Sequence, residues 1–129
     1  MQTFKLNIVT PEGMEFNGEC VEVIIPGSEG MFGVLAKHMN FISSTKAGRV
    51  IVKFENGSEA VYVVSSGIAE VKAGECSVLA ENCIKLSDID VNKTKAKLQE
   101  LQLALETAET ETQSKMIVEQ IEYFKAQLG

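Results

Sequence analysis

Residues 26–41 read PGSEGMFGVLAKHMNF and bring turn-forming residues together with large apolar ones. Pro26, Gly27 and Gly30 favour tight turns, because proline fixes φ and glycine accepts backbone conformations that other residues avoid. The apolar residues have two readings: they fill the core of an ordinary β-domain, or they form a loop that presses on another surface. For Phe32, Val34 and Phe41 the core is favoured, because large apolar residues are usually buried.

Runs of alternating apolar and polar residues flank this stretch on both sides. They are FKLNIV (4–9), CVEVIIP (20–26), VIVKF (50–54), AVYVVSS (60–66), GIAEV (67–71) and CSVLAE (76–81). A period of two indicates strands with one buried face. Turn residues separate the runs, above all Asn56-Gly57, a strong hairpin signal. The first part of the chain therefore predicts an antiparallel β-sandwich or barrel.

The sequence changes character near Ser87, after which no glycine occurs until the last residue. Ser87 and Asp90 are spaced like a helix capping box, with Asp88 as a rival cap. Thr110 and Gln113 are spaced to form a second one. Domains are expected at 1–87, a β-sandwich, and 88–129, a helical hairpin.

Two apolar stripes support the helical prediction. The first follows 7-3-4-3 spacing and the second 4-3-4 spacing, as on one face of a helix. Their members are Val91, Leu98, Leu101, Leu105 and Ala108, then Ile117, Ile121, Phe124 and Leu128. The weak break at TAETETQ (107–113) leaves open both a folded hairpin and one extended arm.

Composition excludes several classes of function. The chain has 129 residues, 45% of them hydrophobic, and a net charge of −6 with scattered lysines, which argues against a nucleic-acid partner. Apolar runs are too short to span a bilayer, and the start resembles no targeting signal. The three cysteines, which lack CxxC spacing, are expected as free thiols in a reducing compartment, and no metal-ligand pattern occurs.

An ordered set of motifs identifies a family. VTPEG (9–13), PGSEGMFGVLAKHMNF, the single glycine before RVIVKF (49–54), SSGIAEV (65–71), SVLAE (77–81) and SDIDV (87–91) occur in order along nearly the whole chain. Each motif is weak alone, but together they make the chain resemble the epsilon subunits of F-type ATP synthases, the counterparts of the mitochondrial delta subunit.

The resemblance implies a flattened sandwich of about ten strands followed by an antiparallel two-helix hairpin. It also implies a non-catalytic rotor subunit, because in that family the sandwich binds the gamma subunit and the c ring and so couples proton flow to ATP synthesis. The hairpin can contact the alpha and beta subunits transiently and regulate ATP hydrolysis. An isolated monomer is expected, and within the complex a place on the cytoplasmic face of a bacterial plasma membrane.

The resemblance also indicates site residues. The surface facing the c ring is expected at Glu29, Met31, His38, Met39 and Asn40, on one rim of the sandwich. His38 has a second reading as a loop residue without a special role.

Some bacterial relatives bind ATP through an Ile/Leu-Asp-x-x-Arg-Ala motif. Ile89, Asp90 and Lys93 stand at its positions, but lysine replaces arginine and Thr94 replaces alanine. Asp90 has a second reading as a helix cap, a role that needs no nucleotide. Lysine lacks the planar fork that holds phosphate oxygens in pairs, and the helical region contains no arginine. No cofactor is expected, and ATP binding is expected to be weak or absent.

Residues 88–129 carry eight acidic residues against five lysines, a net charge of −3. In inhibitory relatives this region is basic and meets an acidic segment of the beta subunit, so like charge should weaken docking here. Two rival classes of function are a binding module of another assembly and an enzyme using Cys83 or His38. The enzyme would require a thiol with a lowered pKa.

Overall fold

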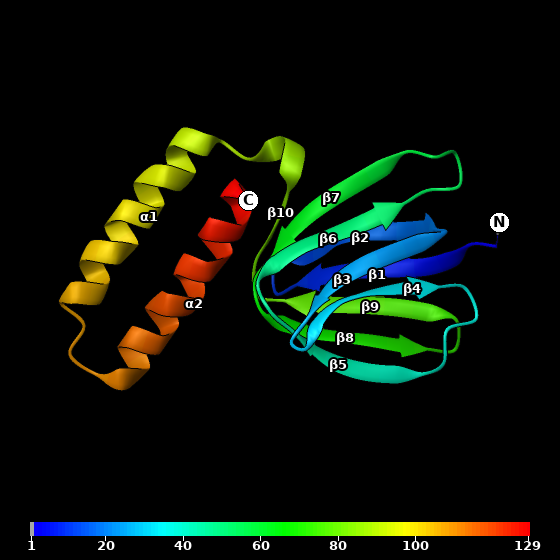
Figure 1. Cartoon of the computed structure of the whole chain (residues 1–129), viewed down its shortest axis with the longest axis horizontal. Helices are drawn as coiled ribbons and strands as arrows, with labels where there is room; N and C mark the ends of the chain where they lie inside the picture. Colours follow the sequence, from blue (N-terminus) through cyan, green and yellow to red (C-terminus); the bar gives the residue numbers. More distant parts are fainter. Residues whose placement is uncertain (1) are drawn as a thin grey trace.

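The computed structural model describes residues 2–129 and shows strands followed by two helices (Figure 1). The strands are β1 (Phe4–Thr10), β2 (Gly13–Cys20), β3 (Glu22–Gly27), β4 (Gly30–Leu35), β5 (Phe41–Thr45), β6 (Gly48–Lys53), β7 (Glu59–Val64), β8 (Gly67–Lys72), β9 (Glu75–Ala80) and β10 (Cys83–Lys85). A 3-10 turn (Leu86–Asp88) leads to α1 (Val91–Glu106) and α2 (Glu111–Leu128). The predicted fold class, a ten-stranded sandwich followed by a two-helix hairpin, is confirmed.

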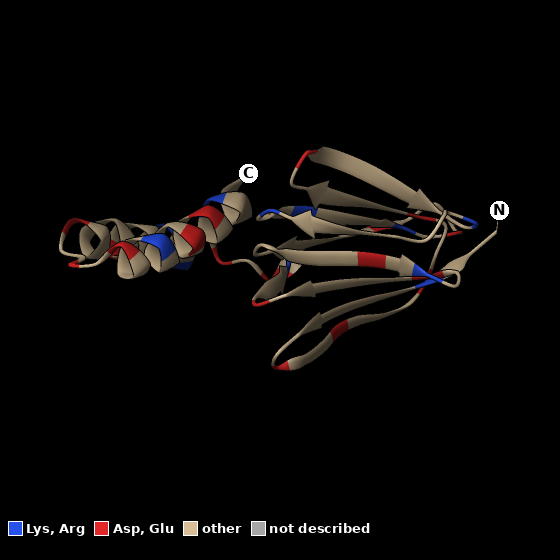
Figure 2. Cartoon of the chain, turned by 90° about the horizontal axis from the view of Figure 1, so that it is seen from below, with Lys and Arg blue, Asp and Glu red and all other residues tan. Residues whose placement is uncertain are grey.

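The strands form one continuous sheet that folds over itself. Their order is β10-β7-β6-β3-β5-β8-β9-β1-β2, and β4 pairs with β3 outside this path. Strands β3 and β5 share only the pair Gly27 and Thr45, so the sheet bends there into two layers, which Figure 2 shows from below. Neighbouring strands are antiparallel with one exception: β1 and β9 run parallel, with Leu6 opposite Cys76.

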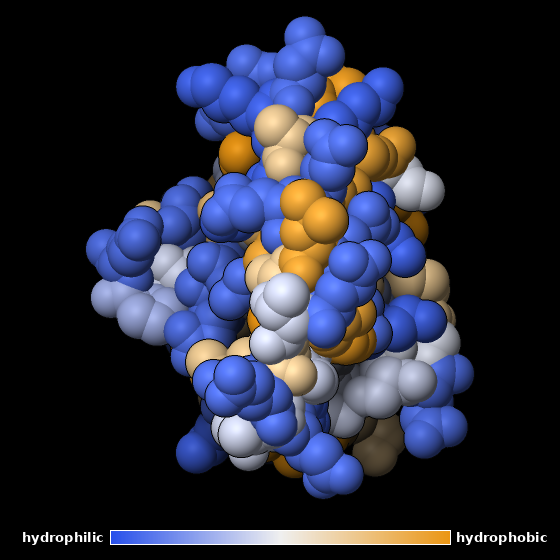
Figure 3. Space-filling model, turned by 90° about the vertical axis from the view of Figure 1, so that its left-hand side faces the viewer, coloured by the Kyte–Doolittle hydropathy of each residue, from blue (hydrophilic) through white to orange (hydrophobic). Residues whose placement is uncertain are grey.

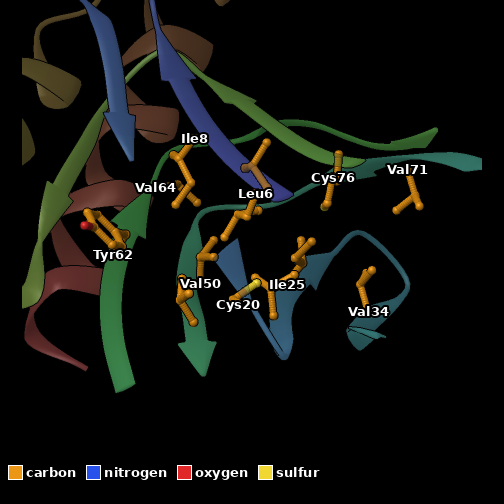
Figure 4. Packing of buried hydrophobic residues seen from close by; sticks show 14 of the residues in the cluster. Leu6, Ile8, Cys20, Ile25, Val34, Val50, Tyr62, Val64, Val71 and Cys76 are labelled. Atoms are coloured by element: carbon orange, nitrogen blue, oxygen red, sulfur yellow. The ribbon is translucent and has the colours of Figure 1, made fainter. Parts of the chain in front are cut away.

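The core lies between the two layers and is built by the alternating runs (Figure 4). Leu6, Ile8 and Val23 are fully buried, as the period of two predicts. Cys20 and Cys76 are free thiols in this core, and burial raises their pKa to about 11 and about 12. Both cysteines therefore act as small neutral apolar groups rather than as reactive thiolates.

The helix caps confirm the predictions for Thr110 and Asp90 and correct the one for Ser87 and Asp88. Thr110 caps α2, because its side chain accepts a hydrogen bond from the backbone N–H of Gln113 at 3.1 Å, as predicted. The cap of α1 is Asp90, which accepts from the backbone N–H of Lys93 at 3.1 Å. The capping box starting at Ser87, and Asp88 as its rival, were wrong predictions, because both residues lie in the preceding 3-10 turn.

The two helices pack as a hairpin, which is one of the two arrangements that the sequence left open. Leu101 and Ile121 are buried between them, but the predicted stripes are wrong at their outer ends. Val91 and Leu128 are 49% and 40% exposed, whereas Thr94 and Gln127 are buried. The reason is a hydrogen bond in which the Thr94 hydroxyl donates to the side-chain oxygen of Gln127 at 2.8 Å.

Helix α2 also packs against one end of the sandwich, at the start of β6 and the end of β7 (Figure 1). Three successive residues of β7 are buried: Tyr62 and Val64 face the core, while Val63 faces outward and is still fully buried. Tyr123 of α2 is buried as well, outside the predicted stripe. Sequence periodicity predicted only one buried face of α2, whereas the helix has two.

Gly67, at the start of β8, provides a test of the close approach between β8 and β9. A Cβ at this position would lie 1.8 Å from the carbonyl oxygen of Leu79, which is backbone and has little room to move. We expect Gly67→Ala to lower the free energy of unfolding by about 2–3 kcal/mol, measured by urea denaturation. The control is Gly33→Ala, whose Cβ would meet the flexible Glu22 carboxylate at 2.9 Å. An equal loss in both variants would contradict this account.

Candidate functional site

The five residues predicted to face the c ring do not lie on one rim. Glu29 lies in the turn between β3 and β4, whereas His38, Met39 and Asn40 lie in the loop after β4, at the opposite end of that strand (Figure 1). All five are exposed, Met31 by 53% and Met39 by 82%. The surface that connects them is β4 itself.

Strand β4 is well suited to contact another molecule along its length. It pairs with β3 alone, so its other edge has no strand partner among the described residues. Its outward positions are Met31, Gly33 and Leu35, all exposed, and they join the two turns into one continuous edge. We call residues 29–40 the β4 edge. An unpaired edge with exposed methionines is a typical place for contact with a partner.

The inward residues of the same stretch belong to the core, which confirms the reading favoured from the sequence. Val34 is buried, and Phe32 and Phe41 pack against the core with their ring centroids 5.3 Å apart. Because successive side chains of a strand point to opposite faces, the exposed and the buried apolar residues of the stretch 26–41 lie on different faces. The core reading is confirmed for these inward residues, whereas contact of the exposed residues with a partner stays a prediction.

The loop after β4 holds its exposed side chains through local contacts. Lys37 adopts a left-handed conformation with φ of 70°. Asn40 accepts a hydrogen bond from the backbone N–H of Ala73 at 3.2 Å, which ties the loop to the turn between β8 and β9. The His38 ring lies 2.9 Å from the Met39 carbonyl oxygen and stacks near Phe41, with centroids 4.9 Å apart. His38 and Asn40 therefore stabilise the conformation of the loop, whereas the side chain of Met39 extends into solvent.

A second candidate surface consists of residues that were not singled out from the sequence. Val9, Ile68 and Leu79 lie on adjacent strands in direct register, on the outer face of the second layer. Ile68 and Leu79 are each 44% exposed. They line a shallow hollow together with Pro11, Gly67 and Ala80. We call Val9, Ile68 and Leu79 the apolar face. Each of the three residues stands at an outward-facing position of its strand. An apolar residue at such a position is the signal from which the sequence could have predicted this surface.

The positions matching the nucleotide motif do not fit a tight phosphate site. The Asp90 carboxylate is occupied as the cap of α1, and Lys93 is an exposed side chain in the first turn. Arg49, the only arginine of the chain, donates to backbone carbonyls at the end of α2 instead. Among the described residues, no arginine guanidinium is therefore placed at this position to hold two phosphate oxygens at once.

The enzyme reading finds no support in the geometry of Cys83 or His38. Burial raises the pKa of Cys83 to about 12 and the nearby Glu15 adds to the shift, whereas a nucleophilic thiol needs a lowered pKa. Within residues 2–129, no three His, Cys, Asp or Glu side chains gather to hold a metal ion. No helix of that range is long and apolar enough to cross a membrane.

Solved structures with a similar fold belong to mitochondrial ATP synthases. One is a chain of the Euglena gracilis OSCP/F1/c-ring structure, with a TM-score of 0.76, 24% identity, and coverage of 94% of this chain and 76% of that one. Another comes from the Tetrahymena thermophila central stalk and c-ring structure, with a TM-score of 0.65, 13% identity, and coverage of 96% and 95%. At these identities the likeness establishes the fold.

Sequence comparisons establish the family. The family model of the ATP synthase delta/epsilon chain β-sandwich domain matches residues 3–86. The ATP synthase epsilon chain of a Nitratiruptor species is 34% identical over 84% of both chains. The epsilon chain of Afipia carboxidovorans is 32% identical over 97% of this chain and 91% of its own length. With its ten-stranded sandwich and two-helix hairpin, the chain therefore belongs to the ATP synthase delta/epsilon chain family.

Proposed function

We propose that this protein is a non-catalytic rotor subunit that couples proton translocation to ATP synthesis by linking the gamma subunit to the c ring. The observation that carries the proposal is the apolar face, formed by Val9, Ile68 and Leu79, with the exposed Met14 directly opposite Val9 on β2. Exposed apolar clusters of this kind mark protein interaction sites. Family membership makes the gamma subunit the partner to test first.

The β4 edge supplies the second surface that a linker needs. We assign it to the c ring, with Glu29, Met31, His38, Met39 and Asn40 distributed along its length. A subunit that transmits force between two partners must resist deformation, and the packed core between the two layers provides that resistance. Two solved structures with a similar fold contain a c ring, one of them together with a central stalk, which supports this assignment. Within such a complex the chain would lie on the cytoplasmic face of a bacterial plasma membrane.

The first test separates the two surfaces. Ile68→Glu places a charge in the apolar face, and we expect it to weaken binding of the purified chain to a gamma subunit by at least about tenfold, measured by calorimetry. Met31→Glu is the matched control, because it places the same charge on an exposed apolar residue of the β4 edge. Gamma binding should survive Met31→Glu, while association with a c ring should weaken. Unchanged gamma binding in Ile68→Glu would refute the assignment of the apolar face.

The second test concerns nucleotide. We propose that ATP binds weakly or not at all, because Asp90 caps α1 and Lys93 stands in place of an arginine. Titration with Mg-ATP should give a Kd weaker than about 1 mM. Lys93→Arg should strengthen binding, whereas Lys95→Arg, on an exposed lysine of the same helix, should not. A Kd tighter than about 10 μM for the natural chain would overturn this proposal.

Regulation of ATP hydrolysis by the hairpin, through transient contact with alpha and beta subunits, is the finer part of the proposed function. Figure 2 shows acidic and basic residues interspersed along α1 and α2, and residues 88–129 have a net charge of −3. Like charge should make docking on an acidic segment of a beta subunit weak. Removal of residues 88–129 from the assembled complex should then raise hydrolysis by less than about twofold. A much larger rise would show a strong inhibitory arm despite the charge.

A further inference from the structure

The strand order leaves three strands with a single strand partner each among the described residues. They are β10 and β2, at the two ends of the order, and β4, which pairs with β3 alone. The unpaired edge of a strand presents backbone N–H and C=O groups that a strand of another molecule can bind. Each of these edges is therefore a place where a sheet can be extended by a second chain.

The three edges differ in length and in charge. Strand β2 carries the exposed Glu15 and Glu19 and no lysine or arginine, so two copies of β2 would bring like charges together. Strand β10 has only three residues, too few for an extended ladder. Strand β4 has no charged residue, and its Met31 and Leu35 are 53% and 50% exposed. Of these edges, β4 is the one suited to pair with a copy of itself.

The free backbone groups of β4 belong to its outward-facing residues. Pro26 of β3 stands opposite Met31 and has no N–H, so these two residues do not form a hydrogen-bonded pair. Because the two kinds of pair alternate along an antiparallel ladder, Gly33 and Leu35 also direct their backbone groups away from β3. The Leu35 carbonyl accepts from the His38 N–H at 3.2 Å, which limits the free edge at that end. Gly33 is therefore the centre of the part of β4 that another strand can bind.

The charges beside β4 favour one register for a second copy. An antiparallel pairing about a twofold axis at Gly33 places Met31 of each copy opposite Leu35 of the other. The same register brings Glu29 of one copy to Lys37 of the other, at both ends of the ladder. Both charged residues are exposed, and neither takes part in an ion pair within residues 2–129. A register shifted by two residues would leave both charges without a partner.

We propose that two copies of this chain pair through the β4 edge, antiparallel and with Gly33 of each copy at the centre. A second copy is the partner because the edge is complementary to itself in backbone groups, in apolar side chains and in charge. The contact is short, so we expect a weak dimer with a Kd of about 10–100 μM. Well below that concentration the chain is the monomer expected from the family resemblance.

This pairing goes beyond the proposed function and involves only residues of this chain. Its consequence for assembly rests on the proposed function, since the β4 edge is also the surface assigned to the c ring. One edge cannot hold two partners at once, so a paired chain has to separate before it joins a rotor. Self-association is measured on the free chain, and its outcome is therefore independent of whether a c ring binds this edge.

Reversal of the charges gives the first test. We expect the natural chain to shift from monomer to dimer between about 5 and 500 μM in sedimentation velocity. Glu29→Lys and Lys37→Glu should each weaken the dimer at least about tenfold, because like charges then meet at both ends of the ladder. An equimolar mixture of the two variants should dimerise again, since opposite charges then face each other at both ends.

Matched controls separate these local contacts from the change in net charge. Glu12→Lys alters an exposed residue in the turn between β1 and β2, and Lys95→Glu alters an exposed residue of α1. Both controls should dimerise as the natural chain does, and circular dichroism checks that every variant is folded. The proposal is refuted if the natural chain stays monomeric over this range, or if the mixture of Glu29→Lys and Lys37→Glu does not recover.

Disulfide trapping tests the register. In a Cys83→Ser background, chains with Met31→Cys are mixed with chains with Leu35→Cys and oxidised. Residues that form a hydrogen-bonded pair have Cα atoms about 5.5 Å apart, within the range of a disulfide. Met31 of one copy and Met31 of the other are displaced by about 13 Å along the strands. Mass spectrometry should therefore find mostly links between the two different chains. Links mainly between identical chains, or no preference, would overturn the proposal.

Discussion

The parallel pairing of β1 with β9 is the constraint on which the rest of the structure depends. It brings residues 5–9 against residues 75–79 and lets the sheet fold into two layers with one core. Leu6 and Ile8 point inward beside Cys76 and Val78, and all four are fully buried. The same pairing places Val9 next to Leu79 on the opposite face, so a single contact between distant segments creates both the core and the apolar face.

This arrangement is compatible with the proposed role of the chain as a mechanical link. The apolar face and the β4 edge belong to strands that share one core, so force applied at one is transmitted to the other through closely packed side chains. The cysteines are buried or half-buried and their pKa values are raised, which removes the one class of strong nucleophile in the chain from reaction.

The contacts that hold the hairpin on the sandwich differ from those that hold the strands together. Figure 3 views the outer side of the hairpin, where apolar residues form a narrow and interrupted band among hydrophilic ones. Its inner side meets the sandwich through Val63, Tyr123 and the bonds of Arg49, beside an open cleft. Polar contacts at a partly open interface exchange readily with water and contribute little net free energy. The attachment of the hairpin is therefore more polar and less closely packed than the core of the sandwich.

Local patterns in the sequence predicted β1, β3, β6, β7, β8 and β9 and the cap of α2, because alternation and capping depend on residues near one another in the chain. Strands β2, β4, β5 and β10 do not belong to the alternating runs, and the ten-stranded fold class came from the resemblance to a family. Phe32, Val34 and Phe41 were assigned to the core because large apolar residues are usually buried. The folded chain was needed to show that Glu29 and Met39 lie at opposite ends of β4, and that Val9 meets Leu79. It also decided that Thr94 and Gln127, rather than Val91 and Leu128, are buried at the end of the hairpin. Each of these outcomes depends on a partner far away in sequence, and periodicity along one segment carries no information about such a partner.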